Sequence, residues 1–107
     1  MSEQKPAKIA IEGKEKYQRL LAGVPQTCGM KSGAMVLQPG DAVGEHVTEQ
    51  KEEAIIILAG QAEVFVAGKP AFTAAAGELV YIPPQTSHDI KNCGAVPLKY
   101  IYVVTPV

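Results

Sequence analysis

The sequence predicts a single all-β domain, and three observations lead to this prediction. The chain has 107 residues, which is the length of one domain. From Gly29 onward, short apolar segments recur at intervals of about 8 to 12 residues, with glycine or proline at the breaks. The longest apolar segment, residues 54–59, has the length of a buried strand and is too short to cross a bilayer. Many short strands separated by turn residues are typical of a β-sandwich or a β-barrel.

Residues 1–28 depart from this pattern, and we expect them to form an arm that packs on a barrel domain of residues 29–107. Apolar and polar side chains alternate over residues 8–12, which predicts a short strand. From residue 14 to residue 22, apolar side chains spaced as i, i+3 and i+4 predict a short helix that ends before a glycine. The apolar positions of this helix are Tyr17, Leu20 and Leu21.

The barrel residues divide into seven predicted strands, each of which ends near glycine, proline or asparagine. In chain order these strands are residues 34–37, 53–58, 62–67, 72–75, 79–82, 86–91 and 98–104. Gly40, Gly60 and Gly77 are interpreted as turn residues that allow a positive φ. The pair Pro83 and Pro84 favours an extended approach to the strand that follows.

Composition excludes several classes of partner. The formal net charge is -1 and the charges of both signs are mixed, so no basic surface for nucleic acid is predicted. Residues 1–8 lack the apolar stretch of a signal peptide, and we expect no membrane segment. Two cysteines, Cys28 and Cys93, are too few for a disulfide framework. These features favour a cytoplasmic protein.

The chain contains two histidines: His88 lies in the predicted strand 86–91, and His46 lies in a further short segment, outside the seven, that is also interpreted as a strand. Strand alternation puts His46 and Thr48 on one side of their strand, and it puts Glu53 on the same face as the isoleucines that follow it. If the fold brings the two imidazoles and the carboxylate together, they form a mixed nitrogen and oxygen set. Such a set suits iron, manganese, nickel, copper or zinc.

Two spaced patterns run through the barrel residues. The first is G(X)5HXH(X)3-4E(X)6G, with Thr48 in place of the second histidine; its matching residues are Gly40, His46, Glu53 and Gly60. The second is G(X)5PXG(X)2H(X)3N, with Gln85 in place of the middle glycine; its matching residues are Gly77, Pro83, His88 and Asn92. Eight of the ten motif positions agree. The chain therefore resembles the cupin superfamily, as a small single-domain cupin of the type-2 conserved-barrel kind.

This resemblance implies a double-stranded β-helix, the jelly-roll barrel of the cupins. It implies that His46, Glu53 and His88 ligate a divalent transition metal: iron, manganese, nickel, copper or zinc. Thr48 falls at the remaining ligand position, and a threonine hydroxyl there is expected to be a weak or water-mediated ligand. A set of two histidines and one carboxylate leaves open positions for a substrate.

The resemblance also implies a range of functions. Small cupins include isomerases, lyases, decarboxylases and dioxygenases, so we expect a small polar metabolite, such as a sugar acid or an oxo-acid, to be bound or transformed. If it does not ligate, Glu53 is the candidate base, and Tyr81 or Tyr102 is the candidate proton donor. The alternative is a non-catalytic, small-molecule-binding or sensory cupin whose metal site is degenerate at Thr48. A homodimer is expected, with residues 8–22 covering a sheet edge.

Overall fold

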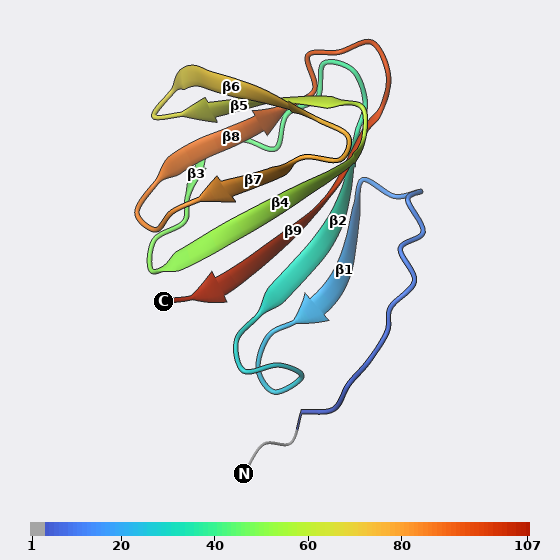
Figure 1. The fold of residues 1–107 in the computed structure, drawn as a ribbon, viewed down its shortest axis with the longest axis vertical. Coiled ribbons are helices and arrows are strands. Elements are labelled where there is room, and N and C mark those ends of the chain that lie inside the picture. The colour runs from blue at the N-terminus through green and yellow to red at the C-terminus, as the bar shows by residue number, and fades with distance from the viewer. Residues whose placement is uncertain (1–3) are drawn as a thin grey trace.

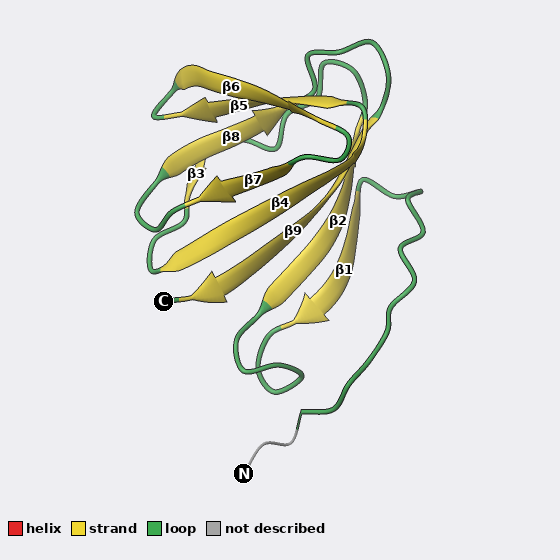
Figure 2. Ribbon diagram, in the orientation of Figure 1, coloured by secondary structure: helices red, strands yellow, loops and turns green. Residues whose placement is uncertain are grey.

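The computed structural model describes residues 4–107, and every regular element in that range is a β-strand (Figure 1; Figure 2). No helix of these residues could cross a membrane. The all-β prediction is therefore confirmed. In chain order the strands are β1 (Tyr17–Ala22), β2 (Lys31–Leu37), β3 (His46–Val47), β4 (Lys51–Ala59), β5 (Gln61–Val66), β6 (Lys69–Ala75), β7 (Leu79–Ile82), β8 (Ser87–Lys91) and β9 (Leu98–Pro106).

The strands form two antiparallel sheets. One sheet has the order β1-β2-β9-β4-β7, and the other has the order β3-β8-β5-β6. Figure 1 shows the first sheet fanning out from β1 to β7, with the strands of the second sheet beyond β7. The chain passes repeatedly from one sheet to the other, so strands that are distant in sequence become neighbours, such as β2 and β9. This arrangement is the double-stranded β-helix of a cupin barrel.

Inward-facing aliphatic side chains from both sheets form the core. Ile55 and Ile57 of β4 are at most 1% exposed, as are Leu37 of β2 and Val64 of β5. Burying each such side chain stabilises the fold by about 1.5–3 kcal/mol. Glu53 precedes these isoleucines on the same face of β4 and is also buried. The alternation of side chains along β4 thus places a carboxylate at the end of the aliphatic core.

The predicted N-terminal helix is wrong. Residues 17–22 form β1, which pairs with β2 as the first strand of the five-stranded sheet. The register of this pairing shifts between Arg19 and Leu21. A bulge of this kind inserts one extra residue and interrupts the alternation, and Leu20 and Leu21 are both half-buried as a result. Two adjacent apolar residues on a bulged strand reproduce the spacing of a helix face.

The predicted strand at residues 8–12 is also wrong, because this segment has no regular structure. Its backbone bonds to a side chain and not to a neighbouring strand. Gln18 donates a hydrogen bond to the Ala10 carbonyl at 2.8 Å and accepts one from the Glu12 N–H at 3.0 Å. Residues 1–3 of the expected arm lie outside the described residues.

The three motif glycines occupy turns that require a positive φ. The φ angles of Gly40, Gly60 and Gly77 are 90°, 81° and 90°. At Gly60 a Cβ atom would lie 2.5 Å from the carbonyl oxygen of Pro97, so a side chain is excluded on two grounds. Gln85, which stands where the family motif has glycine, also has a positive φ, 55°. The backbone has kept the glycine conformation there although the residue has changed.

Candidate metal centre

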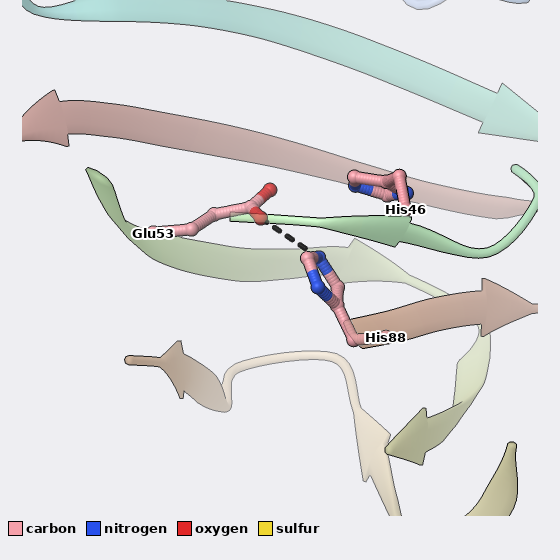
Figure 3. Close-up of side chains that lie close together, drawn as sticks. All are labelled: His46, Glu53 and His88. Atoms are coloured by element: carbon pink, nitrogen blue, oxygen red, sulfur yellow. Dashed lines mark hydrogen bonds and ion pairs between the residues drawn. The ribbon is translucent and has the colours of Figure 1, made fainter. Parts of the chain in front are cut away.

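Three side chains from three strands converge; Glu53 and His88 are buried, and His46 is exposed. His46 of β3 and His88 of β8 are direct cross-strand partners, so both imidazoles project from the same face of their sheet. Their ring centroids are 4.2 Å apart. Glu53 reaches them from β4 in the opposing sheet, as Figure 3 shows. The potential ligand atoms of the three residues all lie within 4.8 Å of one another.

His88 and Glu53 form a buried pair. The His88 Nε2 atom lies 3.0 Å from Glu53 Oε1, and the two residues are 1% and 8% exposed. The His88 Nδ1 atom lies 3.2 Å from the Thr86 carbonyl, which can only accept, so Nδ1 carries a proton. Burial lowers the pKa of His88, but the hydrogen bonds to Glu53 and Thr86 outweigh it and the net pKa is raised. In the metal-free protein these hydrogen bonds favour the protonated form of the His88 imidazole.

His46 presents its other ring nitrogen to the site. Its Nδ1 atom lies 2.8 Å from the Gly44 carbonyl, so the proton of the neutral ring belongs on Nδ1 and the lone pair on Nε2. A backbone carbonyl that orients a histidine in this way is the usual outer partner of a metal-ligating imidazole. Together with the carboxylate of Glu53, the two imidazoles fit a divalent transition metal.

Thr48 is buried close to these residues, and its hydroxyl is bonded to the backbone. Thr48 Oγ1 donates to the Pro83 carbonyl at 2.7 Å and accepts from the Thr86 N–H at 3.0 Å. These bonds join the end of β3 to the loop that leads into β8. The hydroxyl therefore holds together the two strands that carry the histidines. Its role as a weak or water-mediated ligand stays a prediction.

A cavity of about 340 Å³ lies beside the three residues, and His46 and Glu53 are part of its lining. This volume falls within the range of small-molecule pockets. One wall comes from β2 and β9 and carries Met35, Tyr102 and Val104. The wall is apolar and aromatic, whereas the ligand nitrogen and oxygen atoms gather at one side of the cavity.

The tyrosines differ in their relation to this cavity. Tyr81 is 54% exposed and donates to Glu52 Oε1 at 2.7 Å on the outer face of its sheet, away from the cavity lining. Tyr102 lines the cavity, and so does Tyr100, which the sequence analysis did not single out as a site residue. Burial, and then the negative charge of Glu53, raises the pKa of Tyr100. Alternation along β9 was the signal that could have placed Tyr100 beside Tyr102.

Comparison with known proteins agrees with this architecture. The chain is similar to the TT1209 protein from Thermus thermophilus, with 28% identity, a TM-score of 0.70, and coverage of 91% of this chain and 90% of that one. A Cupin 2 conserved barrel domain protein from Salinispora arenicola is 24% identical, with a TM-score of 0.73 and coverage of 96% and 87%. The cupin domain of Schizosaccharomyces pombe Cnp3 is 17% identical, with a TM-score of 0.77 and coverage of 92% and 70%. No curated protein is similar enough to count as a match.

The family comparison covers most of the barrel. The Cupin domain family matches residues 33–104, which is more than half of the chain. The matched segment contains all three residues whose ligand atoms converge, His46, Glu53 and His88. The chain belongs to the Cupin domain family.

Proposed function

We propose that this protein is a metal-dependent small cupin that binds or transforms a small polar metabolite, such as a sugar acid or an oxo-acid. One observation carries this proposal. The ligand atoms of His46, Glu53 and His88 lie within 4.8 Å of one another at a cavity large enough for a small molecule. A structural histidine pair would need neither the carboxylate from the opposing sheet nor the cavity.

The three residues would hold iron, manganese, nickel, copper or zinc. A bound divalent ion would act as a Lewis acid toward an oxygen atom of the metabolite. Without a bound ion, backbone carbonyls already orient the two histidines: the Gly44 carbonyl orients His46, and the Thr86 carbonyl orients His88. Three protein ligands would leave coordination positions of the ion open for the metabolite.

The alternative function is a non-catalytic, small-molecule-binding or sensory cupin with a degenerate metal site. Thr48 is the observation that favours it. The family motif has a histidine at this position, and here the hydroxyl is already bonded to two backbone groups. The loss of one ligand weakens metal binding, although it leaves a site with three protein ligands.

A screen of metal-loaded protein separates these functions. Wild-type protein loaded with each of the five metals is tested for binding and turnover of sugar acids and small oxo-acids. Turnover that His46→Ala and His88→Ala abolish, with folding intact, supports the enzyme. Glu52→Ala is the matched control, because Glu52 adjoins Glu53 but bonds to Tyr81 outside the barrel. Metal-dependent binding without turnover favours the alternative, and a wild-type protein that takes up no metal contradicts the proposal.

A further inference from the structure

β4 and β9, two neighbouring strands of the five-stranded sheet, are apolar on both faces. Their inward side chains belong to the core or line the cavity. The side chains that alternate with these and point outward are also mostly apolar: Ala54, Ile56, Leu58, Ile101 and Val103. An antiparallel sheet with one face in water normally carries polar side chains on that face. Strands that are apolar on both faces are typical of a sheet that is covered on both sides.

The apolar outer face continues onto β7. Leu79 and Tyr81 alternate with buried residues of that strand and are 65% and 54% exposed. The strand register puts Leu79 beside Ile56, which in turn lies beside Ile101 of β9. Figure 1 shows β7, β4 and β9 side by side in the sheet. Their outward apolar side chains form one surface, which we call the outer patch: Ala54, Ile56, Leu58, Leu79, Tyr81, Ile101 and Val103.

The remaining outer faces of the barrel differ from the outer patch. Ala34 and Val36 point outward from β2 but are buried, and they line a small cavity together with Ile11 of the N-terminal segment. With the exception of Phe65, the outward side chains of β5 and β8 in the other sheet are polar: Gln61, Glu63, Ser87, Asp89 and Lys91. Within residues 4–107, the outer patch is thus apolar and still open to water.

The outer patch is large enough to contribute most of a protein interface. Together with Ile11, which is half-exposed near Leu58, it presents on the order of 500 Å² of apolar surface, at the upper end of what monomers expose. A standard interface buries about 800 Å² on each partner, of which roughly three-fifths is apolar. The outer patch and its polar rim therefore match the size of such an interface.

Charges at the two ends of the outer patch indicate which partner fits it. Glu52 pairs with Thr105 near the end of β9, whereas Lys99 lies near the start of that strand, so the two charges are roughly 20 Å apart. When two copies pack these faces with their strands antiparallel, a two-fold axis brings each Lys99 toward Glu52 of the partner subunit. The surface is therefore complementary to itself in charge as well as in apolar character.

We infer that the outer patch is the interface of a homodimer in which two copies pack face to face with antiparallel strands. This inference does not depend on the proposed function. The interface lies on the face of the five-stranded sheet, away from the sheet edge at β1. Glu53 points to the opposite face of β4, so the dimer can be dissociated without a change to the metal-ligand residues.

Sedimentation velocity of the full chain tests the interface. Wild-type protein at about 50 µM is expected to have the mass of two chains. Leu79→Glu is expected to raise the dissociation constant of the dimer at least about 100-fold, because each dimer would then bury two unpaired carboxylates. Val96→Glu is the matched control, since Val96 is 57% exposed in the loop before β9, outside the outer patch. A wild type with the mass of one chain, or a dimer that Leu79→Glu leaves intact, overturns the inference.

Reversal of the end charges tests the antiparallel arrangement. Lys99→Glu places two acidic side chains at each end of the interface and is expected to weaken the dimer about ten-fold. Addition of Glu52→Lys to the same chain restores opposite charges and is expected to return the dissociation constant toward that of the wild type. Circular dichroism and melting temperature verify that each variant is folded. No effect of Lys99→Glu, or no recovery in the double variant, overturns the antiparallel arrangement.

Discussion

Replacement of Thr48 by alanine removes a hydroxyl that joins β3 to the loop before β8. This hydroxyl donates to the Pro83 carbonyl at 2.7 Å and accepts from the Thr86 N–H at 3.0 Å, and Thr48 is 7% exposed. Each lost hydrogen bond costs about 1 kcal/mol, and more where the partner stays buried without another. We expect the free energy of unfolding to fall by about 2–3 kcal/mol. For a domain of this size, that lowers the melting temperature by roughly 10 °C or more.

Urea unfolding of metal-free protein, followed by circular dichroism, measures this loss. Thr48→Ser is the matched control, because it keeps the hydroxyl and is expected to lose only about 1 kcal/mol with the methyl group. The Thr86 carbonyl also accepts from His88, so Thr48→Ala is expected to bind metal about ten-fold more weakly than Thr48→Ser. An alanine variant as stable as the serine variant would refute the structural role of the hydroxyl.

Three further predictions concern the pair of His88 and Glu53 and the turns. In metal-free protein, burial lowers the pKa of His88, but its hydrogen bonds raise the pKa by more, so the folded-state pKa lies above the usual value. The pair therefore stabilises the fold below about pH 6.5, and this contribution is lost as pH rises through the folded-state pKa. Urea midpoints measured against pH should show this loss in wild-type protein and not in Glu53→Gln. Gln85 has a φ of 55°, so Gln85→Gly should raise the free energy of unfolding by about 0.5–1 kcal/mol, and a lower urea midpoint would contradict this. In Gly60→Ala the new Cβ atom would lie 2.5 Å from a carbonyl oxygen, whereas in Gly77→Ala it would have no atom within 4 Å. The first substitution should therefore lower the free energy of unfolding by about 2 kcal/mol more than the second, and equal melting temperatures would refute the close contact.

The barrel strands could be predicted because turn residues separate them. Gly40 and Gly60 have φ angles of 90° and 81°, which other residues rarely adopt. A glycine in the sequence therefore indicates where these strands end. β1 could not be predicted in the same way. Its helix-like spacing comes from a bulge between Arg19 and Leu21 in the pairing with β2. That pairing is a long-range contact, and the local pattern of apolar residues does not contain it.

The candidate site could be predicted only in part. Alternation put Glu53 on the inward face of its strand, and the residue is indeed buried. The pairing of His46 with His88 depends on the register of β3, which is two residues long and carries no pattern of its own. The family motifs therefore supplied what periodicity could not. Tyr100 and Tyr102 are two residues apart and lie on the same face of β9. Their hydroxyls differ because that of Tyr102 lies 3.5 Å from the hydroxyl of Tyr17 in β1, a long-range contact that the local sequence does not contain.

Metal content per chain tests the central claim most directly. It is measured by elemental analysis on protein purified without an affinity tag, for the wild type, His46→Ala and the control Glu52→Ala. A site of three protein ligands predicts about one metal ion per chain in the wild type and the control, and far less in His46→Ala. Equal content in His46→Ala, or none in wild-type protein after reconstitution with Fe(II), Mn(II), Ni(II), Cu(II) and Zn(II), would contradict it.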